Sequence, residues 1–216
     1  KLTSYERINE YSKLDVEPLD TGKVKPPADW PSEGEIKFDN VSFSYDPKNK
    51  LPNVLNELTF TIRAGEKVGI IGRTGAGKSS IIQTLFRMSE PDGQILIDNV
   101  DTKELSLHDL RSKIAIIPQE PIIFTGTIRS NLDPYNVYDD KTIWHSLEQV
   151  QLKDVIKSME GGLDASILKN GSNLSLGQRQ LMCLARAILK NSKIIVIDEA
   201  TANVDYKYKI SIYLIY

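Results

Sequence analysis

The sequence predicts an α/β fold in which a mostly parallel sheet carries an inserted helical lobe. Two apolar runs, Ile114–Ile117 and Ile194–Ile197, are typical of strands that are buried on both faces of a parallel sheet. Residues 125–190 differ from the rest, because they show mostly helical patterns interrupted by glycines and contain no clear strand. We therefore expect a sheet domain into which a helical segment is inserted.

Length and composition limit the class of protein. With 216 residues, of which 40% are hydrophobic, the chain can form one or two α/β domains. A net charge of −2 argues against a protein dedicated to nucleic acid binding. The single cysteine, Cys183, excludes a disulfide framework and indicates a reducing compartment, and we expect it to be a small buried hydrophobic residue. No apolar run approaches the ~18 residues of a membrane span, so any membrane connection is expected outside this chain.

The first part of the chain is predicted to be a linker followed by strands. Residues 1–34 are polar, contain prolines and show little periodicity, so we expect a domain to begin near Glu35. From Ile36 to Tyr45 apolar and polar residues alternate, which predicts a strand with a break at Asp39-Asn40. A second strand is predicted at Leu58–Ile62.

A glycine-rich loop follows the short apolar run Val68–Ile71, which is itself predicted to be a strand. The loop fits the pattern G-x-x-x-x-G-K-[ST] of a nucleotide phosphate cradle. Its glycines allow backbone N–H groups to surround phosphates, and the helix that follows presents its positive end to them. Lys78 would place a charge at the β- and γ-phosphates, and the Ser79 hydroxyl would bind Mg²⁺. The expected phosphate site comprises Gly72, Arg73, Thr74, Gly75, Ala76, Gly77, Lys78, Ser79 and Ser80.

Beyond the cradle, strand patterns return before a long helix. Pro91–Gly93 predicts a turn into a strand at Gln94–Ile97, and the apolar run that starts at Ile114 stops at Pro118. The segment Gln178–Lys190 predicts an amphipathic helix. Its core face is expected to consist of Leu181, Leu184, Ala185, Ile188 and Leu189.

Two acidic residues at the end of the last apolar strand are the second chemical signal. A carboxylate at the carboxyl end of a parallel strand lies where Mg²⁺ would sit beside the phosphates, so Asp198 is the expected metal-side residue. The next residue, Glu199, could polarise the attacking water as a general base. Such an ending is a weak motif alone, but it is specific when it follows a phosphate cradle.

The pentapeptide Leu174–Gln178, directly before the amphipathic helix, is the third signal. Ser175 is a natural N-cap, and the helix start offers free N–H groups to an anion. By itself this pattern indicates only a capped helix.

The cradle, Gln119, the pentapeptide and the Asp-Glu strand follow one another in the order found in ATP-binding-cassette (ABC) ATPases. Residues 30–205 resemble the nucleotide-binding domain of an ABC transporter of subfamily C, the multidrug-resistance-associated proteins. Within that subfamily, the second, C-terminal nucleotide-binding domain of type 4-like members is the most similar in pattern. The resemblance is carried by Trp30-Pro31 with Gly34, Phe38–Val41, Gly72–Ser80, Leu107–Arg111, Ile116–Pro121, Phe124–Thr127, Gly171–Leu189 and Asp198–Asp205.

The resemblance implies a fold and a domain organisation. The fold is a P-loop NTPase core with a mostly parallel sheet, an antiparallel β subdomain and a helical subdomain at about 125–190. Residues 1–34 would be a linker after a transmembrane domain, residues 35–205 the ABC ATP-binding domain, and residues 206–216 a divergent tail.

The resemblance also implies residue roles within the site, with ATP and Mg²⁺ as the bound groups. Tyr45 would be the aromatic platform on which adenine stacks. Gln119 would contact Mg²⁺ and the attacking water and would couple the site to the membrane domain. Ser79 and Asp198 would complete the Mg²⁺ side, and Glu199 would be the catalytic base.

The implied partners are a second nucleotide-binding domain and the transmembrane domains of a transporter, and nucleic acid is not among them. Two such domains sandwich two ATP molecules head to tail, so Ser175, Gly177 and Gln178 would close over the ATP of the partner domain. The segment Ala200–Asp205 would cross the interface. The expected location is the cytoplasmic face of a membrane, through transmembrane domains that this chain lacks.

Two departures from the family pattern bear on activity. Leu176 replaces the usual glycine of the pentapeptide, which adds a side chain where the backbone should approach a γ-phosphate, so the partner's site is expected to be slow or non-hydrolytic. The family's switch histidine should follow Glu199 after another helix and strand, but His108 and His145 both lie upstream and are expected on helix surfaces. The tail Tyr206–Tyr216 does not resemble the family, which indicates a truncated or alternatively terminated product.

Two functions therefore remain open. The first is the ATP-hydrolysing domain of a subfamily C exporter of organic anions or xenobiotics. The alternative is a truncated ATP-binding module with little or no turnover, which would be non-functional or regulatory. A soluble cassette ATPase of DNA repair is disfavoured, because the long heptad-bearing insertion between cradle and pentapeptide is absent.

Overall fold

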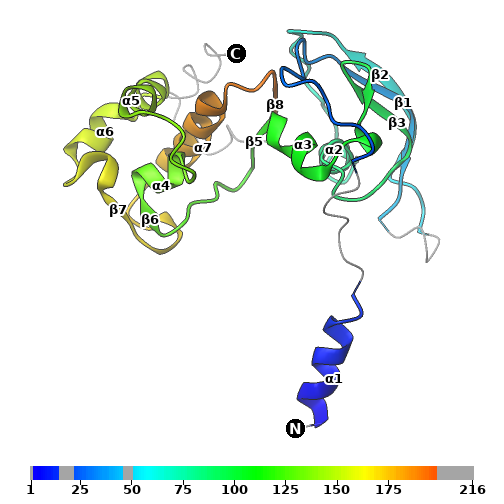
Figure 1. Cartoon of the computed structure of the whole chain (residues 1–216), viewed down its shortest axis with the longest axis horizontal. Coiled ribbons are helices and arrows are strands. Elements are labelled where there is room, and N and C mark those ends of the chain that lie inside the picture. The colour runs from blue at the N-terminus through cyan, green and yellow to red at the C-terminus, as the bar shows by residue number, and fades with distance from the viewer. Residues whose placement is uncertain (1, 15–21, 46–50, 199–216) are drawn as a thin grey trace.

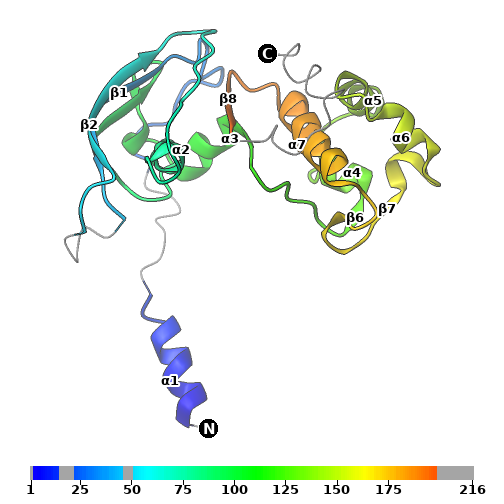
Figure 2. The ribbon, with the colours of Figure 1, turned by 180° about the vertical axis from the view of Figure 1, so that it is seen from behind.

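The computed structural model describes residues 2–14, 22–45 and 51–198. In chain order its elements are α1 (Leu2–Tyr11), β1 (Ile36–Phe43), β2 (Leu55–Ile62), α2 (Lys78–Leu85), β3 (Asp92–Ile97), β4 (Val100–Asp101), η1 (Thr102–Glu104), α3 (Leu107–Lys113), β5 (Ile114–Ile117), β6 (Gly126–Thr127), α4 (Ile128–Leu132), α5 (Asp140–Gln149), α6 (Lys153–Ser158), η2 (Gly162–Asp164), β7 (Ser166–Ile167), η3 (Lys169–Gly171), α7 (Leu176–Lys190) and β8 (Ile194–Ile197). They form two lobes, with the sheet β1–β4 in one and helices α4–α7 in the other (Figures 1 and 2).

The sheet lobe is built on a four-stranded antiparallel sheet in the order β2-β1-β3-β4. The predicted break in β1 is confirmed, because the pairing with β2 shifts register between Phe38 and Val41. Asn40 lies there with a φ of 51°, and such a bulge lets the buried positions resume on the same face. Phe38 and Val41 are therefore both buried despite their odd spacing.

The parallel pair β5–β8 lies between the two lobes and aligns Ile114 with Ile194 and Ile117 with Ile197 (Figure 1). Ile114 and Ile194 belong to the hydrophobic cluster of the sheet lobe, whereas Ile117 belongs to that of the helical lobe. The pair thus contributes to both clusters, but the predicted burial on both faces is confirmed only in part, because Ile116 in the middle of β5 is 43% exposed. Ile197, at the end of the pair, is 40% exposed.

The mostly parallel sheet expected from the sequence is reproduced only in part. In the described segments, parallel pairing joins β5 to β8, while the larger sheet is antiparallel. Asp98 and Asn99 connect β3 to β4 with φ values of 47° and 63°. Such left-handed two-residue turns produce antiparallel hairpins, whereas parallel strands need a long crossover connection.

The strand predicted at Val68–Ile71 is wrong for this structure, because residues 67–73 belong to no helix or strand. Val68 is 48% exposed and Ile71 is 99% exposed. An apolar run forms a strand only when a neighbouring strand pairs with its backbone N–H and C=O groups. Gly69 within the run further weakens its strand preference.

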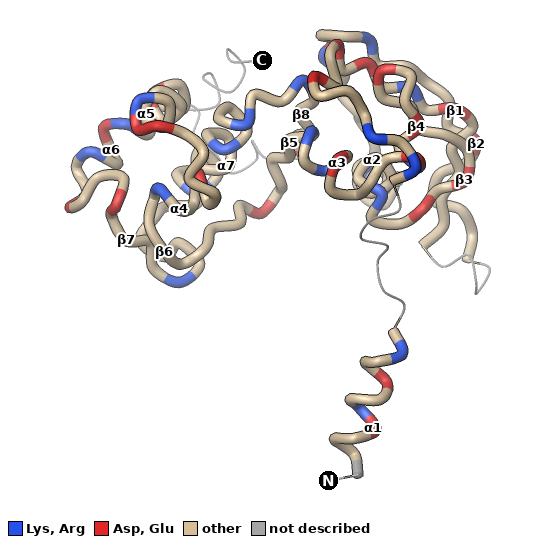
Figure 3. The backbone as a smooth tube through the Cα atoms, in the orientation of Figure 1, with Lys and Arg blue, Asp and Glu red and all other residues tan. Residues whose placement is uncertain are grey.

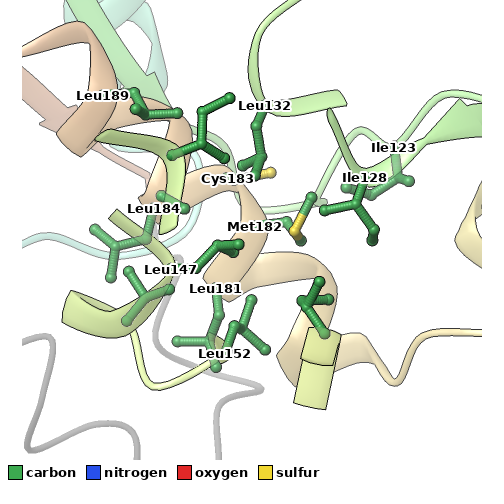
Figure 4. Packing of buried hydrophobic residues seen from close by; sticks show 14 of the residues in the cluster. Ile123, Ile128, Leu132, Leu147, Leu152, Leu181, Met182, Cys183, Leu184 and Leu189 are labelled. Carbon is green, nitrogen blue, oxygen red and sulfur yellow. The ribbon is translucent and has the colours of Figure 1, made fainter. Parts of the chain in front are cut away.

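The helical lobe has its own apolar core, which α4, α5, α6 and α7 build together. Leu147 of α5 and Leu181 of α7 have no exposed surface, and Figure 4 shows both pointing into the cluster. The predicted core face of α7 is confirmed, since Leu181, Leu184, Ala185 and Leu189 are buried and Ile188 packs against them. Cys183 is also buried, as predicted.

The lobe also contains a short strand pair that the sequence did not predict. The two-residue strands β6 and β7 pair antiparallel, joining Gly126 to Ile167 and Thr127 to Ser166. Because each strand has only two residues, it carries no alternation that a sequence pattern could reveal.

The entry to the sheet lobe is held by side-chain hydrogen bonds. Trp30 is buried and its indole Nε1 donates to the carbonyl of Ile97 at 3.1 Å. The Asp98 carboxylate accepts the backbone N–H groups of Glu33 at 3.0 Å, Gly34 at 3.2 Å and Glu35 at 2.8 Å. The packed lobe thus includes residues ahead of the expected start near Glu35.

The segment expected to be an irregular linker contains the helix α1, which stands apart from both lobes (Figures 1 and 2). Tyr5, Ile8 and Tyr11 are all exposed along it. No helix in the described parts of the chain is long and apolar enough to cross a membrane. Acidic and basic residues are interspersed along the backbone of both lobes (Figure 3).

Candidate nucleotide-binding site

The cradle loop turns into α2 through a glycine that no other residue can replace easily. Gly77 is the N-cap of α2 and has a left-handed φ of 89°. A Cβ at this position would lie 3.2 Å from Leu55 and 3.3 Å from Val54. Both the backbone conformation and the lack of space therefore require glycine here.

Lys78 closes the cradle by reaching back across it. Its Nζ donates to the carbonyl oxygens of Gly72 at 2.9 Å and Arg73 at 3.1 Å. An ammonium group has three donors, so one remains after these two bonds. Residues 72–76 and Ser79 are exposed, which leaves the loop and its positive charge accessible from solvent.

The helix behind the cradle ends in the same hydrophobic cluster as the parallel pair. Leu85 and Phe86 at the end of α2 are buried in the same cluster as Ile114 of β5 and Ile194 of β8. The end of the helix and the strands that lead to the predicted metal-side residues therefore share one apolar core.

The carboxyl ends of β5 and β8 bring two predicted site segments together. The Asp198 N–H donates to the Ile117 carbonyl at 3.0 Å, which extends the pairing by one residue. Gln119 follows Ile117 by two residues and is exposed, so Asp198 and Gln119 leave the strand pair at the same end. The predicted base, Glu199, and the segment Ala200–Asp205 lie outside the described residues.

The described residues at this end do not form a metal site by themselves. Within the described ranges, no group of three or more His, Cys, Asp or Glu side chains could hold a metal ion. Mg²⁺ commonly binds through one or two protein oxygens together with substrate phosphates and water. The Ser79 hydroxyl and the Asp198 carboxylate are oxygen donors of this type.

Tyr45, the predicted adenine platform, is joined to the cradle helix. Its hydroxyl and Ser80 Oγ lie 2.9 Å apart and share a hydrogen bond. Its ring meets Phe43 edge-on, with ring centroids 4.9 Å apart. The sequence placed Tyr45 at a strand end but gave no sign of its bond to Ser80, which connects residues 35 positions apart.

The pentapeptide forms the start of α7 as predicted. Ser175 Oγ accepts the Gln178 N–H at 3.1 Å, and Gln178 Oε1 accepts the Ser175 N–H at 2.9 Å, which is a capping box. Gly177 lies between them in the first turn, and Leu176 is 39% exposed. Because α7 belongs to the helical lobe and α2 to the sheet lobe, the two anion-binding motifs lie in different lobes (Figure 1).

The predicted roles of His108 and His145 as helix-surface residues are confirmed. His108 lies in α3 and His145 in α5, and both are exposed. The tail Tyr206–Tyr216 lies outside the described residues.

A partly buried polar clamp that the sequence did not reveal joins α7 to the segment after Gln119. Arg186 donates from Nε to the Asn131 carbonyl at 2.5 Å, from Nη1 to the Ile122 carbonyl at 2.6 Å and from Nη2 to Asn131 Oδ1 at 2.9 Å. Asn131 in turn brackets the Phe124 backbone, since Oδ1 accepts its N–H at 2.9 Å and Nδ2 donates to its carbonyl at 2.8 Å. Burial lowers the pKa of Arg186 below its ordinary value, and the neighbouring Cys183 offsets only part of this decrease. A single arginine in the otherwise apolar run before Lys190 is the only sequence signal of this clamp.

Comparison with known proteins gives the same family as the motifs. The sequence model of the ABC transporter family matches residues 55–202. The chain is 56% identical over 204 residues to the ATP-binding cassette sub-family C member 4 of Mus musculus and 55% identical over 204 residues to that of Homo sapiens. Each of these matches covers 94% of this chain and 15% of the relative, so the chain spans about 15% of the length of these relatives.

A solved structure shares both the fold and part of the sequence. A bacterial Atm1-family ABC exporter with ATP bound superimposes with a TM-score of 0.83 and 28% sequence identity. The match covers 98% of this chain and 37% of that exporter chain. The chain therefore belongs to the ABC transporter family, as an ATP-binding domain homologous to sub-family C members at about 55% identity.

Proposed function

We propose that the chain is the ATP-binding and ATP-hydrolysing domain of a subfamily C exporter and corresponds to its second nucleotide-binding domain. It would lie at the cytoplasmic face of a membrane and couple ATP hydrolysis to the transport of organic anions or xenobiotics. The observation that carries the proposal is the accessible cradle at the start of α2, a helix whose end shares one hydrophobic cluster with the strand pair that ends at Asp198 and leads to Gln119.

The residues of the cradle fit a triphosphate. The loop is exposed, the Lys78 ammonium lies across it, and Gly77 leaves no side chain between the loop and β2. The N-terminus of α2 adds free N–H groups and a positive dipole end. Ser79 and Asp198 would hold Mg²⁺, which neutralises charge that develops on the phosphate oxygens.

Each remaining side chain would have one task in hydrolysis. Tyr45 would bind adenine by stacking, a contact worth roughly 1–3 kcal/mol. Gln119 would orient the attacking water through its amide. Glu199 would accept the proton of that water, which requires an ionised carboxylate within hydrogen-bonding reach. Lys78 would hold the β- and γ-phosphates in place as a point charge.

The second half of each site would come from a partner domain. Ser175, Gly177 and Gln178 at the start of α7 would close over the ATP that the partner holds, in a head-to-tail pair. Leu176 adds a side chain where the backbone should approach a phosphate, so the site completed by this chain would turn over slowly. Removing one preorganised transition-state contact typically costs 10²–10³ in rate.

One observation favours the alternative of an ATP-binding module with little turnover. The run Val68–Ile71, which leads into the cradle, has no strand partner among the described residues. Sites held by strands or helices are more precise than sites held by loops, and hydrolysis needs greater precision than binding.

Steady-state phosphate release separates the two functions. The 216-residue chain is mixed with a first nucleotide-binding domain from a subfamily C relative at saturating Mg-ATP. Glu199→Gln should lower turnover by about 10²-fold or more and leave ATP binding intact, because the amide cannot accept a proton. Glu160→Gln, an exposed glutamate in the helical lobe, is the matched control.

Turnover that survives Glu199→Gln would assign the base role to another residue. Binding of ATP without turnover in the unaltered chain would support the module instead.

A further inference from the structure

The hydrogen bond between Tyr45 and Ser80 joins two parts of the proposed site that are distant in sequence. Tyr45 comes two residues after the end of β1, and Ser80 lies in the first turn of α2. Their oxygens are 2.9 Å apart, within the normal range for a hydrogen bond between hydroxyl groups. The side chain expected to meet adenine is thus attached to the helix whose first residues form the cradle.

The two adjacent serines of the cradle have different surroundings. Ser79 is exposed, so its hydroxyl is accessible to a ligand from solvent. Ser80 is only 3% exposed, and its Oγ is engaged with the Tyr45 hydroxyl. The Ser80 hydroxyl, which the sequence placed in the phosphate site, is thus bound to a protein side chain.

Tyr45 is held at two points and leaves much of its surface free. Phe43 contacts its ring edge-on with an interplanar angle of 74°, and Ser80 binds its hydroxyl. The residue as a whole remains 53% exposed. A flat ring that is held by a neighbouring ring and at its hydroxyl but is still half exposed is suited to stack against a base.

We propose that Ser80 is a positioning residue that fixes the Tyr45 ring for adenine, so that the base and the phosphates are recognised by one preassembled unit. The inference rests on the proposed ATP site. Fixing a side chain before the ligand arrives reduces the entropy that binding must otherwise overcome. The Tyr45 hydroxyl then contributes to ATP affinity without touching ATP.

The test compares two ligands that differ in the nucleoside. The affinities of the 216-residue chain for ATP and for inorganic tripolyphosphate, each with Mg²⁺, are measured by calorimetry. The variants are Tyr45→Phe, Ser80→Ala, their combination and Ser80→Thr, which restores a hydroxyl. Tyr135→Phe and Ser158→Ala, both exposed in the helical lobe, are matched controls for loss of a hydroxyl.

We expect Tyr45→Phe and Ser80→Ala each to weaken ATP binding by about three- to tenfold, the effect of losing one hydrogen bond. The double variant should be no weaker than either single one, because both changes remove the same bond. Tripolyphosphate affinity should stay within about twofold throughout, and Ser80→Thr should restore most of the ATP affinity.

Equal weakening of both ligands by Ser80→Ala would overturn the proposal, because Ser80 would then be a phosphate ligand. Unchanged ATP affinity in Tyr45→Phe would also overturn it. If Ser80→Ala fails to fold, Tyr45→Phe makes the same comparison. If the proposed function itself is wrong, the unaltered chain should bind neither ATP nor tripolyphosphate. This outcome is distinct from a failure of the Ser80 proposal, in which the unaltered chain still binds ATP.

Discussion

The helical lobe and the segment before the cradle use apolar residues in opposite ways. Leu147 and Leu181 are completely buried, whereas Ile71, in the run that leads into the cradle, is 99% exposed. Helices satisfy their backbone hydrogen bonds internally and need only an apolar face to pack. A strand also needs a neighbouring strand for its backbone hydrogen bonds. The apolar side chains of Val68 and Ile71 near the cradle therefore remain exposed.

The two regions also differ in how they hold charge. Arg186 is bound to three carbonyl-type oxygens inside the helical lobe, whereas Lys78 is bound to two carbonyls of an exposed loop. The first arrangement fixes structure. The second leaves a charge available to a ligand, so changes in the two regions should separate stability from nucleotide affinity.

The largest effect is expected from the apolar core of the helical lobe. Leu181→Ala should lower the free energy of unfolding by about 2–5 kcal/mol, because it removes buried methyl groups and leaves a cavity. Ile71→Ala, the matched change at an exposed site, should alter it by no more than about 0.5 kcal/mol. Urea unfolding followed by circular dichroism measures both, and similar losses would show that Ile71 is buried in solution.

An intermediate effect is expected from the Arg186 clamp. Arg186→Ala should cost about 1–3 kcal/mol, because the carbonyls of Ile122 and Asn131 lose their partners. Arg186→Lys should rescue little, since one ammonium cannot reproduce the planar fork. Arg129 bridges Asp140 and Asp164 at the surface, and its replacement by alanine should cost at most about 1 kcal/mol. A larger loss at Arg129 than at Arg186 would contradict this comparison.

A smaller, pH-dependent effect is expected at Asp98. Burial by itself would raise the pKa of Asp98. Hydrogen bonds from the backbone N–H groups of Glu33, Gly34, Glu35 and Ser32 lower it by more than burial raises it, so the net pKa is below its ordinary value. The carboxylate therefore stabilises the fold at pH values above the ordinary pKa, and this contribution is lost as pH falls through the lowered one.

Replacing Asp98 by asparagine should remove that contribution. We expect a loss of about 1 kcal/mol at pH 7, since the amide accepts fewer and weaker hydrogen bonds than a carboxylate. The difference between the variant and the unaltered chain should shrink near pH 3, and urea midpoints at both values measure it. A difference that is constant from pH 7 to pH 3 would show that the charge of Asp98 does not matter.

The features that could be predicted from sequence are those with a local cause. The break at Asp39-Asn40, the cap at Ser175 and the core face of α7 depend on residues within a few positions of each other, and all three are present. The apolar run at Ile114 forms a parallel strand as predicted, but its burial on both faces is only partial, because Ile116 is 43% exposed.

The features that could not be predicted depend on contacts between distant segments. Val68–Ile71 has a strand composition but no strand partner in the described part of the chain. The bond from Tyr45 to Ser80 and the clamp from Arg186 to Asn131 each join polar residues from different elements. No spacing rule connects such residues, so only the folded structure brings them together.

The assignment of the cradle as the ATP site is decided by one titration. The affinity of the 216-residue chain for Mg-ATP is measured by calorimetry for the unaltered chain and for Lys78→Ala, with Lys141→Ala, an exposed lysine of α5, as the matched control. Lys78→Ala should weaken binding about tenfold or more, because a charge-assisted contact to phosphate is worth about 1.5–3 kcal/mol, and Lys141→Ala should not. Equal affinity for Mg-ATP in the unaltered chain and in Lys78→Ala would show that ATP does not bind at this loop.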